Sequence, residues 1–147
     1  MRKNMGIYRG KRKDNGEWIV GYYFERKDTK GNIIEAVIIV DAYEQITNGQ
    51  RYMRSNLNTE CFRVDPETVG QFTGLTDNNG KKIFEGDILK RTNGNKYAWY
   101  VDYKYCAFCG NQSNCNYACE LGELLDQIEL EVVGNIHDNP ELLEVSE

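Results

Sequence analysis

Two sets of side chains alternate along residues 18–24, and a period of two is typical of a β-strand. One set is Trp18, Val20, Tyr22 and Phe24, and the other is Ile19, Gly21 and Tyr23. Turn-forming residues follow at 28–32, and the β-branched run 33–40 supplies a return strand. Residues 17–41 are therefore predicted to form one β-hairpin.

Asn-Gly pairs mark two further hairpins, because this dipeptide favours tight turns between strands. Asn79-Gly80 separates the apolar stretches 71–75 and 82–84, and Asn93-Gly94 separates 87–91 from 97–105. Within 97–105 one face carries Tyr97, Trp99, Val101, Tyr103 and Tyr105. We expect this stripe to be the core side of a strand, and the alternative is a platform on which nucleic-acid bases stack.

Helical signals are short. Apolar residues at helical spacing predict a helix over 121–127, and a final strand is expected over 129–136. Asn139 as cap and Pro140 at the first helical position predict a terminal helix over 139–144. Residues 42–46 are compatible with one helical turn. The predicted fold class is mainly β, with antiparallel hairpins and one or two short helices.

The chain has 147 residues, of which 40% are hydrophobic, enough for one domain or two small ones with a buried core. Its net charge of −5 is unevenly placed: residues 1–30 hold nine Lys and Arg against four Asp and Glu, whereas 119–147 hold nine Asp and Glu and no Lys or Arg. The basic end suits a polyanion. We favour mutual attraction of the two ends, within one chain or between copies, and attraction between copies would give a homo-oligomer.

No membrane segment is expected, because the longest apolar run, 36–40, is far too short to cross a bilayer. No apolar segment follows the basic N-terminus, so a secretory signal is not expected either. These features predict residence in the cytoplasm.

Four of the five cysteines are clustered with the spacing C-x2-C-x5-C-x3-C. Four thiolates satisfy a closed tetrahedral zinc site, and a glycine after the second cysteine resembles a zinc knuckle. The predicted ligands are Cys106, Cys109, Cys115 and Cys119. The alternative is a loop of free thiols; a redox motif is disfavoured because no βαβ pattern surrounds it. Cys61 is predicted to be a buried strand residue.

Catalytic signals are incomplete. Glu85 and Asp87 stand two apart and would share one face of a strand, as a Mg²⁺-binding pair or, more ordinarily, as a solvated edge, and Gly86 between them indicates a bend or bulge. His137 is the single histidine, and a structural role on a loop is expected because no nucleophile elbow accompanies it. No catalytic residue is therefore assigned.

Four blocks of sequence, in order, resemble the YopX family of phage and prophage proteins. They are residues 8–22, 64–75, 77–88 and 131–143. The resemblance implies a β-rich fold in which the Glu-Gly-Asp-Ile block at 85–88 opens a small SH3-like barrel. The family supplies no established activity and no catalytic residues to carry over. The cysteine cluster departs from the family pattern, so chemistry there would be a local addition.

The predicted organisation has an N-terminal β-hairpin subdomain with an irregular connection, 1–63, and a YopX-type core, 64–147, with a cysteine-rich insertion at 106–119. The favoured function is that of a phage- or prophage-encoded accessory protein, non-enzymatic, which binds a host or phage protein in the bacterial cytoplasm. One alternative is a nucleic-acid-associated module that uses the basic N-terminus and the zinc knuckle. The least favoured is a small nucleotide-handling enzyme.

Overall fold

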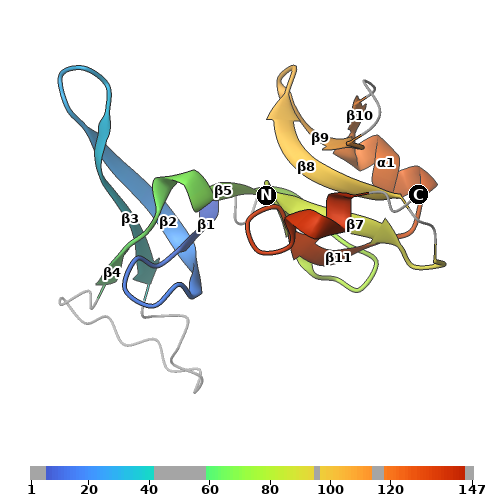
Figure 1. Ribbon diagram of the computed structural model, residues 1–147, viewed down its shortest axis with the longest axis horizontal. Helices are drawn as coiled ribbons and strands as arrows, with labels where there is room; N and C mark the ends of the chain where they lie inside the picture. Colours follow the sequence, from blue (N-terminus) through green and yellow to red (C-terminus); the bar gives the residue numbers. More distant parts are fainter. Residues whose placement is uncertain (1–5, 42–58, 95–96, 114–117, 145–147) are drawn as a thin grey trace. The chain divides into compact units, whose positions relative to one another are not determined.

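The computed structural model describes residues 6–41, 59–94, 97–113 and 118–144 (Figure 1). They form two compact units, one within Gly6–Val69 and the other from Gly70 onward. Every strand pairing in these ranges that has a defined register is antiparallel. The mainly β fold class is confirmed. The predicted helical turn at 42–46 lies outside the described residues.

The N-terminal unit is a sheet in the strand order β4-β3-β2-β1. Its elements are β1 (Ile7–Lys11), β2 (Trp18–Lys27), β3 (Ile33–Asp41), β4 (Thr59–Arg63) and the 3-10 turn η2 (Pro66–Thr68). The hairpin predicted over 17–41 is confirmed as β2 and β3. One face of this sheet is its core, built on Ala36, Ile38 and Val64, with Ile19 and Tyr23 packed against them.

The C-terminal unit contains the hairpin β5 (Gly70–Thr76) and β6 (Lys82–Phe84), and a five-stranded sheet in the order β10-β9-β8-β7-β11. The sheet strands are β7 (Asp87–Arg91), β8 (Ala98–Lys104), β9 (Ala107–Asn111), β10 (Ala118–Glu120) and β11 (Leu130–Asn135). The edge strands β10 and β11 do not pair in the described residues, so no closed barrel is found. The finer likeness to an SH3-like barrel stays a prediction.

Helix α1 (Leu121–Gln127) has the bounds that the apolar spacing predicts. Leu121 and Leu124 pack with Trp99 and Val101 of β8 in the core of this unit. The aromatic stripe of β8 is thus only partly buried: Tyr97, Tyr103 and Tyr105 are 51%, 56% and 88% exposed. Stripe residues belong to the core only where α1 and β11 cover them.

The C-terminal turn η3 (Pro140–Leu143) is a 3-10 helix and lacks the predicted side-chain cap. Asn139 Oδ1 instead accepts the N–H of Asn135 at 3.3 Å, so the side chain closes the end of β11. The helix is consequently left without the Asn cap that the sequence predicts.

Two hairpins are closed by the same five-residue turn, at residues 28–32 and 77–81. In each turn the first residue is Asp, whose Oδ1 accepts the N–H groups of the third and fifth residues at 2.8 and 2.9 Å. The fourth residue is glycine at φ +87° or +80°, in the left-handed region that glycine adopts without strain. A repeated Asp-x-x-Gly-x pattern therefore produces the same local structure twice.

The predicted division after residue 63, into an N-terminal β-hairpin subdomain and a YopX-type core, stays a prediction. In the described residues no helix has the length and apolar character needed to cross a membrane.

Candidate functional site

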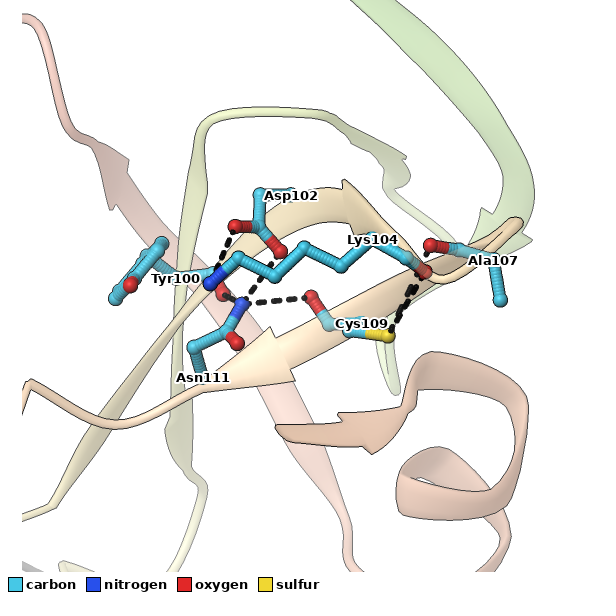
Figure 2. A network of polar contacts seen from close by, with 6 residues as sticks. All are labelled: Tyr100, Asp102, Lys104, Ala107, Cys109 and Asn111. Carbon is cyan, nitrogen blue, oxygen red and sulfur yellow. Dashed lines mark hydrogen bonds and ion pairs between the residues drawn. The ribbon is translucent and has the colours of Figure 1, made fainter. Parts of the chain in front are cut away.

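A polar network lies on the face of β8 and β9 that is turned away from α1 (Figure 2). Its centre is Asp102, which accepts a hydrogen bond from Asn111 Nδ2 at 2.7 Å and forms an ion pair with Lys104 at 3.2 Å. The same Nδ2 lies 3.3 Å from the carbonyl oxygen of Tyr100 and 3.4 Å from that of Cys109. One buried amide thus ties together both strands of the hairpin.

The Cys109 thiol belongs to this network as a hydrogen-bond donor. Its Sγ lies 3.8 Å from the carbonyl oxygen of Lys104 and 3.7 Å from that of Ala107. Burial raises the pKa of this thiol, and the nearby Asp102 carboxylate raises it further. Since the thiolate is the nucleophile in cysteine chemistry, a protonated Cys109 is suited to holding the hairpin and poorly suited to attack.

The turn that joins β8 to β9 has unusual backbone geometry. Tyr105 and Cys106 have φ angles of +51° and +64°, between the paired residues Lys104 and Ala107. Two positive φ angles are typical of a type I′ turn, which usually uses Asn and Gly. Tyr105 and Cys106 are both exposed, so this strained turn projects an aromatic ring and a thiol into solvent.

The structure separates the predicted zinc ligands that it describes. Cys106 is exposed on the turn, and Cys109 is buried on the Asp102 side of β9. Glu120 pairs with Cys109 and Cys119 with Gly110, so Cys109 and Cys119 point to opposite faces of the sheet. Cys119 packs against the core, where burial raises its pKa.

Cys115 lies outside the described residues. Within the described ranges, no group of three or more His, Cys, Asp or Glu side chains is arranged to hold a metal ion. As they lie, Cys109 and Cys119 do not fit one tetrahedral ion, and a zinc site would require β10 to turn over. The zinc site stays a prediction.

The Glu85–Asp87 pair does not share one face of a strand as predicted. Gly86, at φ +91°, bends the chain between them, and β7 begins only at Asp87. Asp87 is 1% exposed and accepts the N–H of Phe84 at 2.7 Å, so it is no solvated edge residue but a buried part of the turn. Burial raises the pKa of Glu85, and the Asp102 carboxylate adds to this shift.

His137 lies on the loop after β11, as predicted. Its backbone N–H donates to Asn135 Oδ1 at 3.0 Å, and its side chain is exposed. Cys61 is exposed in β4, so its predicted burial is wrong. The register explains this, because Cys61 pairs with Ile39 on the sheet face opposite Ile38 and the core.

That second face of the N-terminal sheet, hereafter the outer face, was not singled out by the sequence. Val20, Tyr22 and Phe24 lie along the middle of it and are 44%, 58% and 56% exposed. They pair with Arg9, Ile7, Ile39 and Val37 on the flanking strands. Both alternating sets of β2 are apolar, so periodicity predicts the strand without showing which set is buried.

Cations accompany the apolar row on the outer face. Arg9 and Lys11 lie over the ring of Trp18, with Arg9 Cζ at 4.8 Å and Lys11 Nζ at 5.5 Å from its centroid. Arg63 is exposed on β4 and pairs with Val37. The remaining cation, Arg26, forms an ion pair with Glu35 at 3.3 Å. Among the described side chains, the outer face therefore carries four cations and one carboxylate.

The C-terminal unit has a hollow of the opposite charge. A cavity of about 690 Å³ lies between β5 and α1. Three carboxylates line it, from Glu120, Glu123 and Asp126, above Leu75 and Leu125. A polyanion would be repelled here, so the charge of the chain favours the outer face as the place where an anionic ligand could bind.

Comparison with known proteins agrees with the fold. The structure of protein EF1440 from Enterococcus faecalis is similar, with 24% identity, a TM-score of 0.54, and coverage of 93% of this chain and 96% of that one. Protein yopX from Bacillus subtilis is also similar, with 17% identity, a TM-score of 0.51, and coverage of 97% of this chain and 99% of that one. No curated protein matches the chain. The family model for YopX protein matches residues 7–144, and the chain therefore belongs to the YopX family.

Proposed function

We propose that this protein is a non-enzymatic binding module encoded by a phage or prophage, and that the outer face is its binding surface. The observation that carries the proposal is the exposed row Val20, Tyr22 and Phe24. Contiguous apolar side chains left in solvent on a folded sheet mark interaction sites. Aromatic rings are the side chains most often enriched at such sites.

The chemistry of the polar network supports binding over catalysis. Its thiol is buried with a raised pKa, and its carboxylate already has an amide and an ammonium as partners. The Asp87 carboxylate also has a partner, because it accepts the backbone N–H of Phe84. These groups stabilise strands and turns, whereas a catalytic group needs access to a substrate.

The cytoplasm of the bacterial host is the proposed compartment. The four described cysteines are free thiols, and two of them are exposed. Exposed free thiols persist in a reducing compartment. Fractionation of phage-bearing cells would test the assignment.

Photo-crosslinking tests the binding surface directly. A photoreactive amino acid in place of Tyr22 should give adducts in phage-bearing cells, and the same group in place of exposed Glu141 should not. Val20→Ser with Phe24→Ser should abolish the adducts at 22 without changing the far-ultraviolet circular dichroism spectrum. Equal adducts from both positions, or none from position 22, would contradict the proposal.

A further inference from the structure

We infer that the outer face binds single-stranded nucleic acid, an inference that rests on the proposed function of this face. The sequence favoured a protein partner because the chain is acidic overall. In the structure the three carboxylates of the hollow belong to the other unit, whereas Arg9 and Lys11 lie over the ring of Trp18 on the outer face. The class of ligand follows from the surface that meets it, not from the net charge of the chain.

Tyr22 and Phe24 supply the stacking positions. They stand two residues apart on β2, so their rings leave the same face about 7 Å apart along the strand. Each is more than half exposed, which leaves ring surface for a base. Every base has an aromatic face, so two such rings bind unpaired bases with little sequence preference.

Cations lie on the strands on both sides of this aromatic row. Arg9 is the register partner of Val20, beside Tyr22, and lies with Lys11 over Trp18. On the other side of β2, two strands away, Arg63 pairs with Val37, which itself pairs with Phe24. A strand whose bases stack on the rings would thus have basic groups along its phosphates on both sides.

Fluorescence anisotropy with the full chain tests the inference, using labelled 20-nucleotide oligo-dT and oligo-rU, a 20-base-pair duplex, and poly-L-glutamate as competitor. We expect the single strands to bind more tightly than the duplex and poly-L-glutamate to compete poorly. Each phosphate contact should contribute about −0.7 to the slope of log K against log salt. Binding that is equal for duplex and single strand, or displaced equally well by poly-L-glutamate, would overturn the inference.

Matched variants separate stacking from charge. Tyr22→Leu and Phe24→Leu keep an apolar side chain and should each weaken binding by roughly 5- to 100-fold. Val133→Leu, at an exposed apolar position of β11 outside the outer face, is the control and should leave the affinity unchanged. Arg63→Gln should make the salt slope shallower by about 0.7. Unchanged affinity in both Leu variants would also refute the stacking model.

The two proposals fail in different ways. If the oligonucleotides do not bind while crosslinking at position 22 still yields protein adducts, the ligand class is wrong and the binding surface stands. If neither assay gives a signal, both proposals are wrong. Circular dichroism of each variant shows whether the sheet is retained, since exposed strand substitutions usually change stability by less than about 0.5 kcal/mol.

Discussion

Asp77 joins a hairpin turn to a distant strand, and its removal should destabilise the C-terminal unit. The side chain is 7% exposed, and its Oδ1 accepts two N–H groups of its own turn. Its Oδ2 accepts the N–H of Val132 in β11 at 2.9 Å. The backbone adds a second link, because the N–H of Asn78 donates to the carbonyl oxygen of Leu130 at 2.9 Å.

The size of the effect follows from the three donors that would lose their acceptor. A hydrogen bond to a charged group contributes about 1.5–3 kcal/mol, and a buried donor without an acceptor costs about 1–3 kcal/mol. Asp77→Asn retains one oxygen and turns an NH₂ group toward the remaining donors, so we expect a loss of about 2 kcal/mol. Asp77→Ala removes every acceptor and should cost about 3–5 kcal/mol.

The same contacts make stability depend on pH. Burial alone would raise the pKa of Asp77, but the N–H groups of Val132, Lys81 and Asn79 and the Lys81 ammonium outweigh it, and the pKa is lowered. The carboxylate therefore stabilises the fold fully above its unfolded pKa of about 3.9, and this contribution is lost as pH falls through the lower folded pKa. Asp77→Asn should remove this part of the acid dependence.

Tryptophan fluorescence can report on this unit alone. The chain has two tryptophans, one in each unit, so Trp18→Phe leaves Trp99 as the reporter in the core of the C-terminal unit. Urea titrations in that background should show midpoints lowered by about 1–2 M for Asp77→Asn and further for Asp77→Ala.

The turn at 28–32 provides a matched control. Asp28 makes the same Oδ1 contacts, but its Oδ2 accepts only from the side chain of Asn32 within the turn, at 3.0 Å. Asp28→Asn should leave the Trp99 transition unchanged. Equal small shifts for Asp77→Asn and Asp77→Ala, below about 0.5 kcal/mol, would refute the claim that the contact to β11 stabilises this unit.

Three further outcomes are expected. Gly21→Ala should destabilise the N-terminal sheet by about 2 kcal/mol or more, because the added Cβ would collide with the backbone carbonyl oxygen of Ile39. The unfolding of this sheet can be followed by Trp18 fluorescence in a variant that lacks the other tryptophan. At neutral pH Cys106 should be alkylated rapidly and Cys109 slowly, and a chelator should not change either rate. If Cys106 is instead protected until a chelator is added, and the protein carries about one zinc per chain, the result would support the zinc site. The predicted self-association should appear as a salt-dependent sedimentation coefficient, and a strict monomer at low and high salt would exclude it.

Local signals predicted the hairpin of β2 and β3 and helix α1 because their turn chemistry and apolar spacing are explicit, whereas β9 and most of β10 lie in the stretch predicted as a cysteine-rich insertion. The Asp-x-x-Gly-x pattern fixes two hairpins through contacts within five residues, and the apolar spacing of α1 gives its observed bounds. Two of the failures have a common cause, which is a side chain that accepts a backbone N–H group three or four residues earlier. Asn139 accepts from Asn135 and Asp87 accepts from Phe84, so each side chain is used by its own turn and not in the role that was predicted for it.

The candidate binding surface was hidden for a different reason. In a strand whose side chains alternate between polar and apolar, the apolar side chains indicate the buried face. Strand β2 has apolar side chains on both faces, so its sequence does not indicate which face is buried. Which side is buried depends on Ala36, Ile38 and Val64, which come from β3 and the segment after β4. Sequence could locate the strand and its aromatic rings, whereas only pairing with β1, β3 and β4 could assign the rings to solvent.

Because neighbouring residues of β2 face opposite sides of the sheet, substitutions at neighbouring positions should affect either stability or binding. Gly21 faces the core side, where no room exists for a Cβ, and Tyr22, its neighbour, faces solvent on the outer face. Gly21→Ala should therefore lower the free energy of unfolding and affect binding only through the loss of folded protein. Tyr22→Leu should weaken binding and leave unfolding almost unchanged. If both variants instead changed stability and binding in proportion, the outer face would be part of the folding core and could not serve as an independent binding surface.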